Sequence, residues 1–199
     1  MKTLDSSNVL GSTAMFPDQC FQAWEESSKI VFGEAYKDIY NIVVCGMGGS
    51  RFTPKTIKEL FKDRIKEPYE IVEDYTLPGY VDHDTLVILS SYSGVTEEVL
   101  ACRQDAKKRG ARITAVASKP MTDGPAYIFD PKFNPCGQPR IGGGYLLMGH
   151  LGILKALNMI DIADDEVKLA IDHARTIDKH KGEELANVLF DKHPFIITA

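Results

Sequence analysis

Short, nearly continuous apolar runs alternate along the chain with longer segments in which apolar residues recur every three or four positions. Runs of the first kind are typical of buried strands, and they occupy residues 41–45, 69–72, 85–90, 112–117 and 127–129. The helical pattern covers the first forty residues and residues 53–62, 96–109, 144–160 and 164–191, the last as one helix or as a pair broken at Gly182. Strands separated by helices of ten or more residues predict an α/β fold with a parallel sheet.

Composition narrows the classes of protein without changing this fold prediction. The 199 residues carry a formal net charge of −5, with 44% apolar and 26% charged side chains, which excludes disordered and collagen-like proteins. A mildly acidic chain is unsuited to general electrostatic binding, so we expect no nucleic acid and no membrane as partners. The most apolar stretch, residues 145–157, is too short and too interrupted for a membrane span.

The cysteines give no sign of a metal site. Cys20, Cys45, Cys102 and Cys136 show neither a paired spacing nor a zinc-finger spacing, so we expect no bound metal. Residues 1–11 contain no basic patch followed by an apolar segment. These observations predict a cytoplasmic protein with reduced thiols.

A glycine-rich loop, residues 46–50 (Gly-Met-Gly-Gly-Ser), directly follows the first predicted strand. Glycines let the backbone approach an anion closely, and the helix that follows offers unpaired N–H groups. The loop matches neither the dinucleotide-binding fingerprint, whose third glycine would fall at Arg51, nor the Walker A loop. A tight turn between strand and helix with no ligand is the alternative interpretation.

A second loop, residues 90–98, places four small hydroxyl residues between a buried strand and a helix start, namely Ser90, Ser91, Ser93 and Thr96. Their hydroxyls and the first N–H groups of the helix can donate several hydrogen bonds to one phosphate without any lysine. The alternative is helix capping, which explains one or two hydroxyls more easily than four. We expect Glu97 and Glu98 to be first-turn residues that favour the helix dipole.

Three motifs in order resemble the sugar isomerase (SIS) domain, and within it the bifunctional phosphoglucose/phosphomannose isomerases. The motifs are residues 46–50, residues 91–98 (Ser-Tyr-Ser-Gly-Val-Thr-Glu-Glu) and Gln138-Pro139-Arg140 with Gly144-Tyr145. The segment 74–78 (Asp-Tyr-Thr-Leu-Pro) also fits that branch. The resemblance implies a flavodoxin-like, three-layer αβα sandwich with a parallel sheet and an N-terminal helical extension.

The resemblance also implies the reaction and the site. It implies interconversion of glucose 6-phosphate or mannose 6-phosphate with fructose 6-phosphate, through ring opening and proton transfer between C2 and C1, with no cofactor. Arg140 is the catalytic residue that it assigns, because a fixed guanidinium stabilises a cis-enediolate. Without the resemblance, a surface ion pair would be the preferred role for Arg140. The implied substrate- and phosphate-binding residues are Gly48, Gly49, Ser50, Ser91, Ser93 and Thr96.

The chain departs from the family in several places. Arg51 and Val95 stand where the family usually has glycine and asparagine, and residues 141–143 replace an alanine-rich step. The family's catalytic glutamate, ring-opening histidine and a further lysine belong to a second SIS domain and have no match here. His150 lies in an apolar helix, where we expect a packed or interface histidine.

These departures lead us to expect the N-terminal half of a two-domain enzyme. The predicted divisions are a helical segment at 1–40, the SIS domain at 41–160, a C-terminal helix or helices at 161–193, and the start of a second domain at 194–199. Two alternatives stay open: a single-domain isomerase such as 6-phospho-3-hexuloisomerase, and a non-catalytic module that binds sugar phosphates. A homodimer is expected, with the apolar helix at 145–160 as a candidate for the buried surface.

Overall fold

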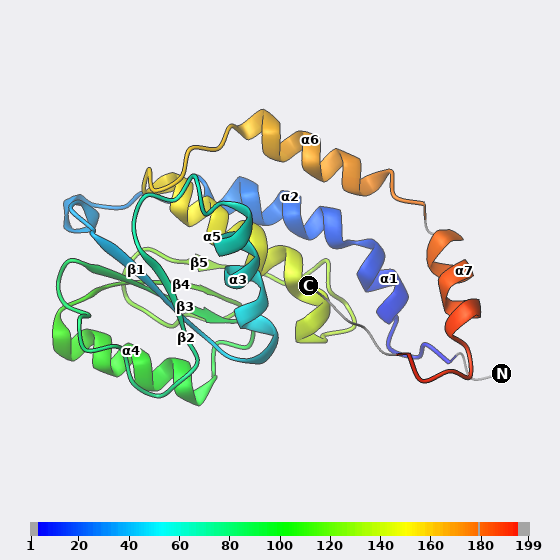
Figure 1. Ribbon diagram of the computed structural model, residues 1–199, viewed down its shortest axis with the longest axis horizontal. Helices are drawn as coiled ribbons and strands as arrows, with labels where there is room; N and C mark the ends of the chain where they lie inside the picture. Colours follow the sequence, from blue (N-terminus) through cyan, green and yellow to red (C-terminus); the bar gives the residue numbers. More distant parts are fainter. Residues whose placement is uncertain (1–3, 179, 195–199) are drawn as a thin grey trace.

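A parallel β-sheet of five strands forms the centre of the computed structural model, which describes residues 4–178 and 180–194 (Figure 1). The strands are β1 (Asn41–Gly46), β2 (Tyr69–Val72), β3 (Thr85–Ser91), β4 (Arg112–Ala117) and β5 (Tyr127–Ile128). Their order is β2-β1-β3-β4-β5, the flavodoxin-like order. All five predicted runs therefore form strands, and the predicted parallel sheet is confirmed.

Helices form in the segments where the 3.6-residue periodicity predicts them. They are α1 (Val9–Ala14), α2 (Phe16–Ser27), α3 (Phe52–Leu60), α4 (Glu97–Arg109), α5 (Gly143–Ala156), α6 (Asp164–Arg175) and α7 (His180–Leu189). Three short 3-10 helices lie in the connections between strands and helices: η1 (Glu34–Tyr36), η2 (Gly48–Arg51) and η3 (Pro139–Gly142). None of the helices in the described part of the chain is long and apolar enough to cross a lipid bilayer.

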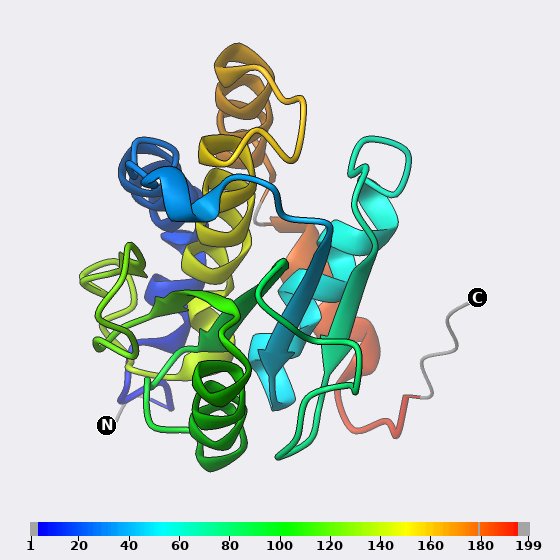
Figure 2. The ribbon, with the colours of Figure 1, turned by 90° about the vertical axis from the view of Figure 1, so that its left-hand side faces the viewer.

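Side chains that alternate along the strands build two cores, one on each face of the sheet. On one face, Ile42, Val44, Leu86 and Ile88 pack with residues of α2, α3 and α5. On the other face, their neighbours in the strands pack with Val99, Cys102 and Ala106 of α4. Figure 2 shows α4 on the opposite side of the sheet from α2 and α5. This arrangement confirms the three-layer αβα sandwich.

The N-terminal helices belong to the same core as the sheet. Trp24 of α2 is 1% exposed, and its indole Nε1 donates a hydrogen bond to Asp164 Oδ1 at the start of α6, at 3.2 Å. Arg175 at the end of α6 pairs with Asp18 of α2 at 3.1 Å. Helices α2 and α6 are therefore tied to each other as well as to the core under the sheet (Figure 1).

The apolar helix α5 is buried inside its own chain. Close approach to α2 needs glycine at position 152, because a Cβ there would overlap the side chain of Ser27. Most residues of α5, from Gly144 to Leu154, are buried by the rest of the chain. The expectation that this helix is a partner-binding surface is therefore wrong, since α2 already covers it.

Two predicted helix limits also differ from the structure. Helix α5 ends at Ala156 rather than at 160, where Ile160 instead forms an antiparallel bridge with Ile65. The break between α6 and α7 falls after Arg175 and not at Gly182, which lies inside α7. Thr176 Oγ1 donates to the carbonyl oxygen of His173 at 2.7 Å and so ends α6. Of residues 194–199, predicted to begin a second domain, residues 195–199 lie outside the described residues.

Candidate functional site

The glycine-rich loop and the hydroxyl loop lie side by side at the carboxyl edge of the sheet. Gly46, the last residue of β1, pairs in register with Ser90 of β3. Ser90 Oγ donates a hydrogen bond to the backbone oxygen of Ser50 at 2.8 Å, and the backbone N–H of Tyr92 donates to Ser50 Oγ at 3.2 Å. Strands β1 and β3 flank the point where the strand order reverses, which is where sheets of this type bind ligands.

The glycine-rich loop keeps its backbone accessible. Gly48 is exposed and has a φ of 51°, a left-handed conformation that favours glycine. A Cβ on Gly46 would lie 3.2 Å from Ser90 Cβ, so a small residue is needed where the two loops approach. Two glycines of the predicted loop thus have a structural reason: close approach to Ser90 at Gly46 and the left-handed conformation at Gly48.

The hydroxyl loop is a compact turn whose side chains are partly satisfied. Ser91 Oγ and Thr96 Oγ1 lie 2.7 Å apart and share a hydrogen bond. The N–H of Gly94 donates to Ser91 Oγ at 3.1 Å, and the N–H of Val95 donates to Ser93 Oγ at 3.3 Å. Because these backbone groups are donors, the Ser93 hydroxyl hydrogen and one hydrogen of the Ser91–Thr96 pair stay available for an anion.

Capping does not account for these hydroxyls. Thr96 occupies the N-cap position of α4, yet its side chain makes no capping hydrogen bond. Its hydroxyl is turned to Ser91 instead. The first N–H groups of α4 have no partner within the helix, as at every helix start. Hydroxyl hydrogens and helix N–H groups therefore converge on the same loop, an arrangement suited to a phosphate.

The third predicted motif meets the first one in space. Gly49 lies against Arg140, since a Cβ on Gly49 would be 3.5 Å from Arg140 Cγ. Arg140 lies in η3 and is exposed, and within residues 4–178 and 180–194 it forms no ion pair. The surface ion pair that we considered for this arginine is therefore not present there. The three motifs, up to 94 residues apart in sequence, form one surface.

Arg51, one of the departures from the family pattern, is held in an ion pair with a neighbouring carboxylate. Its guanidinium forms an ion pair with Glu73, which directly follows β2, and Lys55 of α3 binds the same carboxylate at 2.8 Å. Arg51 also lies over the ring of Phe52. Two cations close to the glycine-rich loop thus share one carboxylate and are drawn toward β2.

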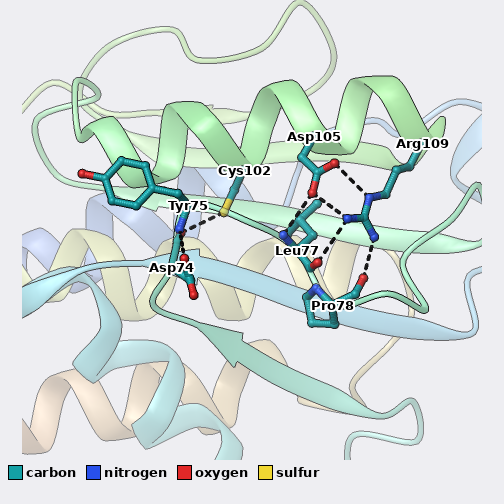
Figure 3. Close-up of polar contacts among 7 residues, drawn as sticks. All are labelled: Asp74, Tyr75, Leu77, Pro78, Cys102, Asp105 and Arg109. Carbon is teal, nitrogen blue, oxygen red and sulfur yellow. Dashed lines mark hydrogen bonds and ion pairs between the residues drawn. The ribbon is translucent and has the colours of Figure 1, made fainter.

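The loop between β2 and β3 is fastened to α4 and borders the site (Figure 3). Arg109 donates hydrogen bonds to the carbonyl oxygens of Leu77 and Pro78, at 3.2 and 2.6 Å, and Asp105 accepts from the N–H of Leu77 at 3.1 Å. Asp105 also pairs with Arg109 at 2.8 Å, and this hydrogen bond lowers the pKa of Asp105. The segment 74–78 is thereby held as a fixed wall along α4, with Leu77 and Pro78 fastened near the C-terminal end of that helix.

Tyr75 in this wall faces the first turn of α4. Its side chain is half exposed, and in Figure 3 it extends away from the Asp105–Arg109 network. The negative charge of Glu98 is the largest cause that raises the pKa of Tyr75, with a smaller contribution from Glu97. Both glutamates begin α4 as predicted, and their charges act on the wall formed by segment 74–78.

His150 lies away from this surface. Its ring is fully buried in α5, and Nδ1 lies 2.6 Å from the backbone oxygen of Leu146. Burial lowers the pKa of His150 to about 4. The histidine is therefore neutral and packed, the role expected from the sequence, and it is not placed to exchange a proton with a ligand at the loops.

Three residues at the site carried no role in the sequence prediction. The ring of Tyr92, a member of the hydroxyl motif, turns into the core and bonds through its hydroxyl to Asn134 at 2.6 Å. Lys119, after β4, packs against Gly94, whose Cβ would lie 2.9 Å from Lys119 Cβ. The preference for glycine at 94, with a φ of 70°, was the available signal for a crowded turn. Nothing in the sequence signals the bond from Asn134 to Tyr92, because the two residues are 42 positions apart.

Other chemically suggestive features lie elsewhere. A surface hollow of about 400 Å³ includes Tyr36, His83 and Arg112, near the amino ends of the strands. Asp82, His83 and Asp84 hold potential metal-ligand atoms within 4.8 Å of one another. Asp84 is already paired with Arg112 at 3.4 Å, and Asp82 accepts the N–H of Asp84 at 2.9 Å, so these carboxylates build the turn before β3.

Comparison with known proteins gives the same family as the motifs. The model of the SIS domain matches residues 36–123. The bifunctional phosphoglucose/phosphomannose isomerase of Caldicellulosiruptor bescii is 37% identical over 155 residues, which are 76% of this chain and 46% of that protein. The enzyme of the same description from Aquifex aeolicus is 32% identical over 183 residues, 87% of this chain and 53% of that protein. The chain thus spans about half the length of the curated relatives that it matches.

A solved structure agrees on the fold. The C-terminal domain of glucosamine-fructose-6-phosphate aminotransferase from Francisella tularensis has a TM-score of 0.60 and 15% identity. The match covers 93% of this chain and 58% of that one. At this identity the likeness concerns the fold alone, and the sequence relatives carry the narrower relationship. The chain contains a SIS domain and is homologous to the bifunctional phosphoglucose/phosphomannose isomerases.

Proposed function

We propose that the chain binds a phosphorylated sugar at the carboxyl edge of β1 and β3 and supplies part of the active site of an aldose–ketose isomerase. The observation that carries this proposal is the convergence of residues 46–50, 91–96 and 138–140 on one surface. The homology to phosphoglucose/phosphomannose isomerases supports glucose 6-phosphate, mannose 6-phosphate and fructose 6-phosphate as substrates. The reaction needs proton transfer and no cofactor.

The phosphate group would bind at the hydroxyl loop. Ser93 and the Ser91–Thr96 pair have hydroxyl hydrogens to donate, and the first turn of α4 adds backbone N–H groups. Ser50 and the backbone of Gly48 and Gly49 would then face the sugar. This division of roles suits a chain of negative net charge, because the anion is held by dipoles and hydroxyls rather than by an excess of lysines.

Arg140 would act at the reacting carbons. Its side chain passes beside Gly49, and its guanidinium has no carboxylate partner among the described residues, so the charge is available to a ligand. A cis-enediolate carries negative charge that the substrate lacks, and a fixed cation therefore stabilises the transition state more than the ground state. Arg140 is the catalytic residue of the proposal.

The general base would come from elsewhere in a longer enzyme. His150 is buried in α5, and the exposed positions of Gly48 and Arg140 leave the surface open to a covering element. The curated relatives are about twice as long as the matched region. We therefore propose that this chain is the N-terminal half of such an enzyme. A homodimer and a cytoplasmic location remain part of the proposal.

Calorimetric titration and an isomerase assay on the same polypeptide test this function. We expect fructose 6-phosphate to bind, and Ser93→Ala and Thr96→Ala to weaken it at least tenfold, since each removes a hydrogen bond to a charged group worth about 1.5–3 kcal/mol. Thr56→Ala is the matched control, because its hydroxyl donates to the Phe52 carbonyl within α3, away from the loops. Unchanged affinity in the two loop variants would contradict the phosphate assignment.

Turnover separates the proposal from its competitors. Formation of both glucose 6-phosphate and mannose 6-phosphate only after addition of the second half would support the half-enzyme. Binding without turnover in any combination would support a non-catalytic module that binds sugar phosphates, for which the buried His150 is the favouring observation. Turnover of a 3-hexulose 6-phosphate by this chain alone would favour the single-domain isomerase.

A further inference from the structure

Tyr92 lies between two proposed phosphate-binding serines, yet it faces the core. It is 8% exposed, and its ring is 5.3 Å from the ring of Phe129. The ring also fills the space beside Gly142 in η3, where a Cβ would overlap it. One side chain thus joins the hydroxyl loop to the short helix that carries Arg140.

Hydrogen bonds extend this junction to the segment before Arg140. The hydroxyl of Tyr92 accepts one Nδ2 hydrogen of Asn134 at 2.6 Å, and the other Nδ2 hydrogen is donated to the backbone oxygen of Gln138 at 2.9 Å. Asn134 is 3% exposed, so its amide has no water to replace a lost partner. The backbone oxygen of Gln138 also accepts the N–H of Ile141 at 3.0 Å, which closes the turn around Arg140.

The backbone of Tyr92 fixes the other two sides of the site. Its N–H donates to Ser50 Oγ at 3.2 Å, and its carbonyl oxygen accepts the N–H of Ser118 at 3.1 Å. Tyr92 is therefore in contact with the glycine-rich loop, the loop after β4 and the Arg140 segment at once. A rigid connection of this kind sets the distance between a bound phosphate and a guanidinium.

We propose that Tyr92, acting through Asn134, is a positioning residue that holds Arg140 at a fixed place relative to the phosphate-binding hydroxyls. The inference rests on the proposed function, because it assigns a role to a residue of that same site. Its consequence is specific: loss of the Tyr92 hydroxyl impairs recognition of charge at the reacting carbons and spares recognition of phosphate. A displaced Arg140 guanidinium matters because catalysis by a fixed charge depends on preorganisation.

Two probes make the consequence measurable. Inorganic phosphate reports on the hydroxyl loop alone. A phosphorylated five-carbon aldonate carries a carboxylate where the enediolate would develop charge, so it reports on Arg140 as well. In the unaltered chain we expect the aldonate phosphate to bind more tightly than inorganic phosphate, and Arg140→Ala to remove the difference. A chain that binds neither probe, or an Arg140→Ala variant that keeps the difference, would reject the proposed function and this inference with it.

Tyr92→Phe then tests the inference by itself. The variant keeps the ring against Phe129 and Gly142, and we expect it to bind inorganic phosphate within twofold of the unaltered chain and the aldonate phosphate about tenfold more weakly. Tyr92→Phe combined with Arg140→Ala should bind no more weakly than Arg140→Ala alone, because coupled residues are non-additive. Tyr36→Phe is the matched control, since it removes a 2.7 Å bond to the Ile113 carbonyl outside the site.

Asn134→Ala removes the other partner of the same hydrogen bond, and it provides the test if Tyr92→Phe does not fold. It should show the same selective loss for the aldonate phosphate. Equal losses for both probes, no loss for the aldonate phosphate, or losses that add to that of Arg140→Ala would each overturn the positioning role while leaving the phosphate site in place.

Discussion

Ser90 Oγ donates a hydrogen bond to the backbone oxygen of Ser50 at 2.8 Å, and this bond joins the carboxyl end of β3 to the glycine-rich loop that follows β1. Ser90 is fully buried. The Ser50 carbonyl therefore has a buried side chain as a hydrogen-bond partner. Because Ser50 Oγ in turn accepts the N–H of Tyr92, a single buried hydroxyl influences the geometry of both proposed binding loops.

Ser90→Ala should weaken both the fold and ligand binding. Removing a buried partner from a carbonyl costs about 1–3 kcal/mol, so we expect a lower free energy of unfolding in urea. We also expect weaker binding of fructose 6-phosphate, because Ser50 loses its anchor. Thr114→Val is the control: it removes a 2.8 Å bond from a fully buried hydroxyl to the Pro125 carbonyl, away from the loops. The two variants should lose similar stability, and a similar loss of binding in both would contradict this role of Ser90.

Gly94→Ala should damage the hydroxyl loop. Gly94 has a φ of 70°, and a Cβ there would lie 2.9 Å from Lys119 Cβ and 3.1 Å from its backbone oxygen. We expect a loss of about 1–2 kcal/mol from the left-handed conformation alone, and more from the clash. Calorimetry should show loss of inorganic phosphate binding. Gly79→Ala, in a position with free space and no positive φ, should leave both stability and binding unchanged; an equal effect would reject the steric argument.

Glu73→Gln should strengthen phosphate binding. Glu73 pairs with both Arg51 and Lys55 beside the glycine-rich loop, so its neutralisation frees these two cations from their shared carboxylate and raises the local net charge by one unit. We expect roughly threefold tighter binding of inorganic phosphate at low ionic strength, an effect that salt removes because the Debye length falls to about 3 Å at 1 M. Glu34→Gln changes the net charge equally but breaks a pair with Lys37 in the η1 segment before β1. A matching gain in Glu34→Gln would show that net charge alone is responsible.

The strands could be predicted because their signal is local. Apolar runs such as residues 41–45 and 85–90 are buried on both faces of a parallel sheet, so composition alone marks them. The signal for the end of α4 is equally local, because Gly110 has a φ of 73° and follows three basic residues in the last turn. The break after α6 was mispredicted because it depends on a Thr176 cap rather than on the glycine at 182.

The candidate site could be predicted only in part. The loops were visible as glycine and hydroxyl clusters at strand ends, and the resemblance added Arg140. The connection between them was not visible, because Tyr92 and Asn134 are 42 residues apart and neither belongs to a periodic pattern. Nor could the sequence indicate that Glu73 neutralises Arg51 across the edge of the sheet. Contacts between distant residues depend on the fold, and here they determine which charges are free.

His150 should make the fold sensitive to acid. Burial lowers its pKa to about 4, whereas an unfolded histidine titrates near 6.5. As pH falls through 6.5 the unfolded chain takes up a proton that the folded chain refuses, so stability is complete above this range and declines toward pH 4. A difference of this size is worth on the order of 3 kcal/mol.

Urea unfolding of the unaltered chain and of His150→Leu between pH 7 and pH 4 isolates this contribution. Carboxylates titrate in both proteins, so the difference between their unfolding free energies should change over this interval in favour of His150→Leu, which has no group to protonate. Nε2 of His150 is buried without a hydrogen-bond partner in the described structure, so leucine removes no polar contact at that atom. His173→Gln, on the exposed face of α6, is the control for the replacement of a histidine outside the core. Parallel curves for the unaltered chain and His150→Leu would mean that the histidine is protonated in the folded state, and the buried, neutral role would have to be abandoned.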